Sequence, residues 1–141
     1  TCFAIVVTSY NWGAFPARTG TFQSGYRKVG FDFSRAERAR YENLRELIDM
    51  IPTDASVAAS EKVGPHASSR RRFYSLRRGH YDADYILVRK GELSLDRTQQ
   101  SVRKALESRK YGVARQLDDI VLLERGADPK DNGRLIKAWG L

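Results

Sequence analysis

The segment from Pro52 to Val88 constrains the fold most, because its pattern predicts a strand, a short helix and two further strands in that order. Ser56–Ser60 consists mostly of small residues, as in a strand buried on both faces. Phe73-Tyr74 and Tyr85–Val88 carry the aromatic and β-branched residues of two more strands. A strand–helix–strand order predicts a right-handed crossover and at least one parallel pair of strands.

Two amphipathic helices are predicted on either side of this segment. Ser34 and Glu37 form a capping box for the first helix, and Pro52 ends it. We expect Asp96 to cap the second helix, with Gln99 as its reciprocal partner. The apolar stripes at helical spacing are Tyr41, Leu44, Leu47, Ile48 and Ile51 in the first helix and Val102, Ala105 and Leu106 in the second.

After the second helix the pattern changes to a β-hairpin. Tyr111–Leu117 and Ile120–Glu124 are its strands, and two aspartates form the turn. We expect a loop over Gly126–Gly133 and a last helical turn over Arg134–Trp139. The sequence therefore predicts an α/β fold: a small mixed sheet of about five strands with two main helices. The predicted order is helix, strand, short helix, strand, strand, helix, hairpin.

Composition limits the class of partner without choosing one. The chain has 141 residues, a formal net charge of +8 and a pI near 9.9, which favours nucleic acid, anionic lipid head groups or phosphorylated substrates. Its one cysteine, Cys2, excludes an intrachain disulfide and a thiolate metal cluster.

The first residues allow two interpretations. Cys2–Val7 is apolar but far shorter than the roughly 20 residues of a bilayer span, and it lacks the features of a signal peptide. It is either a first β-strand or the trailing end of a membrane helix. Asn11–Phe33 is rich in glycine and aromatic residues without a steady period, which predicts an extended connector.

Three stretches of the chain carry a resemblance to a known family. They are Ile51-Pro52-x-Asp54-Ala55-Ser56-Val57-x-Ala59-Ser60, then Val63-x-Pro65-His66-x-Ser68-x-Arg70, and Tyr74 followed by Ala83-Asp84-Tyr85-Ile86-Leu87-Val88. These stretches resemble a bacterial family of multi-spanning membrane proteins, the family called domain of unknown function 2079. The resemblance covers roughly the last two-thirds of the chain.

The resemblance implies a domain organisation and a location. Residues 1–33 would be the end of a membrane helix plus an extended connector, and residues 34–141 a soluble domain on the extracytoplasmic side of the cell membrane. The family is similar to membrane glycosyltransferases that use lipid-linked sugars, and their catalytic acids lie between membrane helices. The implied partners are the membrane-embedded part of the same protein and anionic lipid or lipid-linked phosphate. The alternative is a free-standing basic domain that binds nucleic acid or another anionic ligand.

Three polar residues follow the first predicted strand of the sheet. Ser60, Glu61 and His66 lie past its carboxyl end, where open α/β sheets bind ligands. They could bind a polar head group or perform acid–base chemistry. We favour the alternative that Ser60 caps the short helix and His66 hydrogen-bonds across a loop.

Basic and aromatic residues alternate further along the same segment. We favour a solvated edge strand over lipid or phosphate contact, and either of these over nucleic acid. The basic residues are Arg70, Arg71, Arg72, Arg77 and Arg78, and the rings are Phe73, Tyr74, His80 and Tyr81.

The candidate ligand-binding residues are Ser60, Glu61, His66, Arg70 and Arg72. We assign no catalytic residue, metal ligand or cofactor, because the chain carries no phosphate loop, dinucleotide fingerprint, nucleophile elbow or histidine pair at metal spacing. The aspartate pairs Asp82/Asp84 and Asp118/Asp119 are assigned to a strand start and a turn rather than to calcium.

Overall fold

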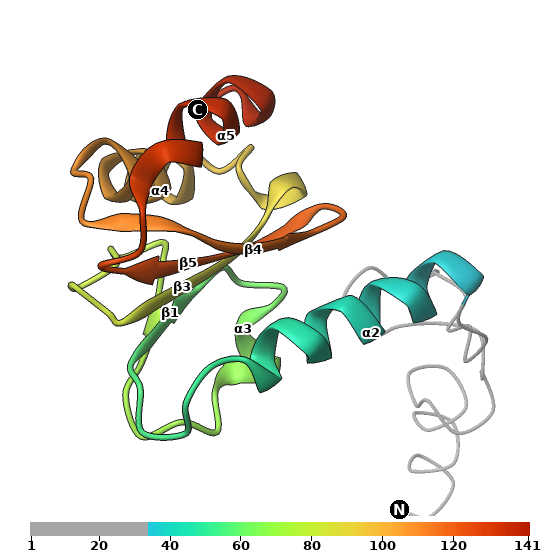
Figure 1. Cartoon of the computed structure of the whole chain (residues 1–141). Coiled ribbons are helices and arrows are strands. Elements are labelled where there is room, and N and C mark those ends of the chain that lie inside the picture. Colours follow the sequence, from blue (N-terminus) through green and yellow to red (C-terminus); the bar gives the residue numbers. More distant parts are fainter. Residues whose placement is uncertain (1–33) are drawn as a thin grey trace, which may run out of the picture. The chain divides into compact units, whose positions relative to one another are not determined.

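The structure is a computed structural model that describes residues 34–141 (Figure 1). Residues 39–141 form one compact unit. The sequence-based expectations for Thr1–Tyr10, as a strand or a membrane-helix end, and for the connector up to Phe33 lie outside the described residues.

The order of elements follows the sequence-based prediction, with short 3₁₀ turns added. The elements are α2 (Arg35–Asp49), β1 (Val57–Ala59), α3 (Gly64–Ala67), β2 (Phe73–Ser75), β3 (Tyr85–Arg89), η1 (Lys90–Glu92), α4 (Asp96–Glu107), β4 (Tyr111–Leu117), β5 (Ile120–Arg125), η2 (Pro129–Asp131) and α5 (Asn132–Trp139).

The five strands form one mixed sheet in the order β2-β1-β3-β5-β4 (Figure 1). β1 runs parallel to both β2 and β3, while β5 pairs antiparallel with β3 and with β4. The α/β class, the mixed five-stranded sheet and its parallel pairs are thereby confirmed. β2 lies at one edge of the sheet, as the interpretation of a solvated edge strand requires.

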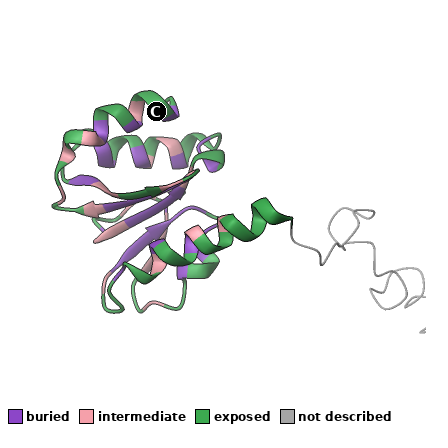
Figure 2. Cartoon of the chain, turned by 45° about the vertical axis from the view of Figure 1, so that its right-hand side comes forward, coloured by how far each residue is buried: buried purple, intermediate pink, exposed green. Residues whose placement is uncertain are grey.

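The sheet separates two layers of apolar packing. Leu44, Leu47 and Ile51 of the α2 segment pack on one face with the apolar side of α3, and α4 and α5 cover the other face. Val57 and Ala59 face the α2 layer, whereas Ala58 faces α4. β1 is therefore buried on both faces, which explains its small apolar residues, and the central strands are largely buried in Figure 2.

The two predicted helix starts had different outcomes. At α2 the capping box is confirmed: the Ser34 N–H donates to Glu37 Oε2 at 2.8 Å, and the Glu37 N–H donates to Ser34 Oγ at 3.2 Å. At α4 the predicted cap is wrong, because Leu95 is the N-cap residue and no side chain caps the helix. Gln99 donates instead to the carbonyl of Gly140 at 3.0 Å, so a contact with the C-terminal residues replaces the local box.

The hairpin is confirmed, but the predicted loop over Gly126–Gly133 is partly wrong. Its end forms η2 and the start of α5. Asn132 is buried, and its Nδ2 donates to the carbonyls of Leu106 at 3.0 Å and Tyr111 at 2.8 Å. These bonds join residues more than 20 positions apart in the chain. Because local sequence patterns cover only neighbouring residues, they do not predict such bonds.

A serine and an aspartate fasten the amino ends of β1 and β3 together. The N–H and Oγ of Ser56 both donate to Asp84 Oδ2, at 2.9 and 2.6 Å, and the Asp84 N–H donates back to Ser56 Oγ at 2.9 Å. Arg125 Nη2 donates to Asp84 Oδ1 at 2.6 Å. The hydrogen bonds from Ser56, aided by the Arg125 charge, hold the pKa of Asp84 below its ordinary value.

We expect Asp84→Asn to lower the free energy of unfolding by about 1–3 kcal/mol at neutral pH, the usual value for hydrogen bonds to a charged group. Because the folded pKa is depressed, this contribution is present above the ordinary carboxyl pKa and is lost as the pH falls through the folded pKa. Urea unfolding at several pH values should show the two proteins converging in acid. Asp54→Asn, on an exposed residue, is the control, and a difference that persists at low pH would contradict the assignment.

Gly112 marks a close approach of two backbones. A Cβ there would meet the backbone carbonyl of Asp128 and lie 2.7 Å from the carbonyl carbon of Ala127. At Gly133, in α5, a Cβ would meet nothing within 4 Å.

Gly112→Ala should therefore destabilise the fold by about 1–3 kcal/mol through overpacking against backbone. Gly133→Ala should stabilise it by about 0.5–1 kcal/mol through helix propensity. Opposite shifts in the urea midpoint are expected, and a midpoint unchanged by Gly112→Ala would contradict the observed packing.

Candidate functional site

The carboxyl ends of the parallel strands β1, β2 and β3 lie along one edge of the sheet. This is the edge at which open α/β sheets bind ligands. Ser60 follows β1, Leu76 follows β2, and η1 follows β3.

Ser60 is a buried structural residue. Its Oγ donates to Glu92 Oε2 at 2.6 Å, and the Lys62 N–H donates to Glu92 Oε1 at 2.6 Å. Ser60 and Glu92 are only 1% and 3% exposed, so a ligand has no direct access to either side chain. The expected cap is wrong, because Val63 is the N-cap residue of α3 and no side chain caps that helix.

Glu61 and His66 contact different residues. Glu61 pairs with Arg77 at 3.2 Å on the surface. His66, in α3, contacts the ring of Tyr41 edge-on with 5.8 Å between ring centroids. Ser60, Glu61 and His66 thus form no hydrogen-bonded set of the kind that acid–base chemistry requires.

Arg70 and Arg72 hold the end of α2 and the turn after it. Arg70 donates to the carbonyls of Ile48 at 3.1 Å, of Ile51 at 3.0 Å and of Pro52. Arg72 donates to the carbonyl of Asp54 at 3.3 Å. A cation at the C-terminal end of a helix also opposes the negative end of its dipole. Both guanidinium groups therefore have partners within the fold.

A groove of about 760 Å³ lies between the edge strand β2 and the first turn of α4. We call it the arginine groove. Its lining includes Glu61, Tyr74, Arg77, Arg78, Tyr81 and Arg97. Of the five ligand-binding candidates predicted from the sequence, Glu61 alone lines this groove.

The charges of the groove are only partly balanced. Glu61 neutralises Arg77. Within residues 34–141, by contrast, no hydrogen bond or ion pair occupies the guanidinium of Arg78 or of Arg97. Two positive charges are thus available to an anion in the groove.

Two tyrosines form the aromatic part of the groove. The rings of Tyr74 and Tyr81 lie 5.2 Å apart, tilted by 34°, and Tyr81 is 58% exposed. Tyr81 and Asp82 have φ values of 48° and 51°, in the left-handed region that costs a non-glycine residue about 1–3 kcal/mol. Arg125 Nη1 supports this strained turn by donating to the carbonyl of Asp82 at 2.8 Å.

His80 and Tyr111 form the support beneath the turn. The Tyr111 hydroxyl donates to the carbonyl of Ala83 at 2.7 Å, and burial raises the pKa of Tyr111 to about 12. The His80 ring packs edge-on against Tyr111 at 5.4 Å, and burial lowers the pKa of His80. His80 Nδ1 accepts the Asp82 N–H at 3.3 Å, which requires that nitrogen to be unprotonated.

The aspartate pairs serve the fold. Asp84 binds Ser56 and Arg125, while Asp119 pairs with Arg89 at 2.6 Å. Across residues 34–141, no three His, Cys, Asp or Glu side chains come together in a way that could hold a metal ion.

The sequence identified part of the groove. Arg77, Arg78, Tyr74 and Tyr81 belong to the basic and aromatic segment noted there. Arg97 was missed. Its signal is a basic residue in the first turn of a helix, where the dipole favours an acid.

Comparison of the chain with protein-family models, with curated proteins and with solved structures finds no match in any of the three. The resemblance of residues 51–88 to the domain of unknown function 2079 stays a prediction.

Neighbouring substitutions separate a structural from a ligand-binding role for Ser60. Ser60→Ala should cost about 1–3 kcal/mol of unfolding free energy, because it leaves the buried Glu92 carboxyl group short of one partner. Glu61→Ala, at the exposed next position, should change it by less than about 0.5 kcal/mol. Denaturant unfolding measures both, and a Ser60→Ala variant as stable as the parent would overturn the structural role.

Proposed function

We propose that residues 34–141 form the soluble, non-catalytic C-terminal domain of a bacterial membrane protein, on the extracytoplasmic side, and that its arginine groove side lies against anionic lipid. The parent protein would resemble membrane glycosyltransferases, with the chemistry performed in its membrane-embedded part.

The arginine groove is the observation that carries this proposal. Arg78 and Arg97 bring charge that has no partner within residues 34–141, and Tyr81 exposes an amphipathic ring beside them. Arginine and an aromatic ring together suit the interface between lipid head groups and water. Most of the basic residues behind the net charge of +8 lie in the described part of the chain.

Ser60 and Glu61 make contacts that hold the fold and the groove together. None of the helices described in residues 34–141 has the length and apolar character needed to cross a bilayer.

The paired tyrosines also favour a second candidate, a free-standing basic domain that binds nucleic acid. Bases stack on aromatic side chains in proteins that bind single strands. Such proteins usually track several nucleotides along a positively charged channel. The groove offers two partnerless arginines at one place, so we rank this candidate second.

Vesicle binding tests the proposal. The 141-residue chain should sediment with vesicles that contain phosphatidylglycerol and not with phosphatidylcholine vesicles, and added salt should release it. Arg78→Ala/Arg97→Ala should weaken binding about 30-fold, since each arginine near an anionic surface contributes about 1 kcal/mol.

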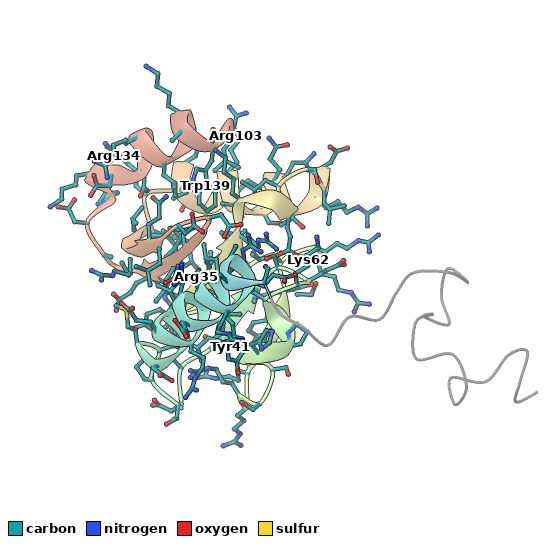
Figure 3. The ribbon with its side chains drawn as sticks, turned by 90° about the vertical axis from the view of Figure 1, so that its right-hand side faces the viewer. Arg35, Tyr41, Lys62, Arg103, Arg134 and Trp139 are labelled. Atoms are coloured by element: carbon teal, nitrogen blue, oxygen red, sulfur yellow. The ribbon has the colours of Figure 1, made fainter. Side chains whose placement is uncertain are left out.

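The control removes the same charge elsewhere. Arg134→Ala/Lys137→Ala alters exposed residues of α5, and Figure 3 shows Arg134 well apart from Lys62, the neighbour of Glu61. Equal losses in the two double variants would mean that net charge alone drives binding, which contradicts a lipid-facing groove. Absence of binding at low salt would remove the proposal.

A further inference from the structure

We propose that the arginine groove is a binding site for a small phosphorylated ligand that also carries a ring, such as a sugar phosphate or a nucleoside diphosphate. This inference goes beyond the membrane proposal and does not depend on it. It rests on two features of the groove: guanidinium groups that have no partner within residues 34–141, and a pair of neighbouring tyrosine rings.

The phosphate would bind between Arg78 and Arg97. The two side chains come from different elements, Arg78 from the turn after β2 and Arg97 from the first turn of α4. Guanidinium groups bind phosphate oxygens in a bidentate way, and two of them from separate elements suit a dianion. Arg77 would stay with Glu61, so the groove's carboxylate is already neutralised and does not repel the ligand.

The start of α4 does not by itself attract an anion. Leu95 is its N-cap residue and makes no side-chain cap hydrogen bond, but Asp96 in the first turn opposes the positive end of the helix dipole. Arg97 lies in that same first turn and lines the groove. The attraction for an anion therefore comes from the guanidinium groups of Arg78 and Arg97.

The ring would pack against the tyrosines. Tyr81 is 58% exposed and contacts Tyr74 with 5.2 Å between ring centroids, which leaves ring surface open to the groove. The left-handed backbone at Tyr81 and Asp82 holds this ring at a steric cost that the fold maintains. A volume of about 760 Å³ is within the range of small-molecule sites.

Titration of the ¹⁵N-labelled 141-residue chain tests the site and separates its parts. Uridine 5′-diphosphate and glucose 1-phosphate carry phosphate and ring, glycerol 3-phosphate represents a lipid head group without a ring, and methyl glucoside carries a ring alone. We expect the first two to shift amides of Arg78, Tyr81 and Arg97. Their dissociation constants should be at least about tenfold lower than that of glycerol 3-phosphate, and methyl glucoside should not bind.

Single variants assign the two halves of the site. Arg78→Ala and Arg97→Ala should each weaken glucose 1-phosphate binding about tenfold or more, as expected for a lost charge-assisted hydrogen bond. Tyr81→Ala should bring glucose 1-phosphate and glycerol 3-phosphate to equal affinity. Arg134→Ala, on exposed α5, should change nothing.

Several results would overturn the inference. These are shifts absent for every phosphate at millimolar concentration, equal binding of all phosphates by the parent chain, or equal loss in Arg134→Ala. A single-stranded oligonucleotide that binds far more tightly than uridine 5′-diphosphate, with the same variants affected, would reassign the groove to nucleic acid. Sugar phosphate binding without vesicle binding would reject the membrane proposal and leave this inference standing.

Discussion

The buried contact of Ser60 and Lys62 with Glu92 is the interaction on which the rest of the site depends. It ties the chain leaving β1 to η1, the turn that follows β3, through two bonds of 2.6 Å, and the side chains of Ser60 and Glu92 are buried. A buried carboxyl group is costly unless hydrogen bonds satisfy it, so the three groups fix one another. η1 in turn leads into α4, and Glu61, between Ser60 and Lys62, lines the arginine groove. The same contact therefore orients two walls of the groove.

The total number of arginines does not locate the site. What locates it is which of these arginines have a hydrogen-bond or ion-pair partner in the fold and which do not. The chain is strongly basic, yet many arginines are committed to the fold: Arg70 holds the end of α2, Arg89 pairs with Asp119, and Arg125 pairs with Asp84. Such partners cannot be read from composition, because they come from distant parts of the chain. Arginines without a partner in residues 34–141 indicate a binding site only where several of them line one groove together with aromatic rings. Arg78 and Arg97 do so beside Tyr74 and Tyr81.

The sequence correctly predicted the elements whose formation depends on residues close together in the chain. The capping box of Ser34 and Glu37 and the hairpin after α4 depend on neighbours in the chain, and these predictions are confirmed. The prediction failed where a group far away in the chain offers a residue another hydrogen-bond partner. Gln99, for example, donates to the carbonyl of Gly140 instead of capping α4. The same limit applied to the site. Ser60 stands at the expected edge of the sheet, but its buried partner Glu92 lies 32 residues away in the chain.

The most direct test is an experimental structure of the 141-residue chain with uridine 5′-diphosphate bound. We expect the phosphates between the guanidinium groups of Arg78 and Arg97, with the uridine beside the ring of Tyr81. A ligand bound elsewhere, or an empty groove at saturating ligand, would contradict it.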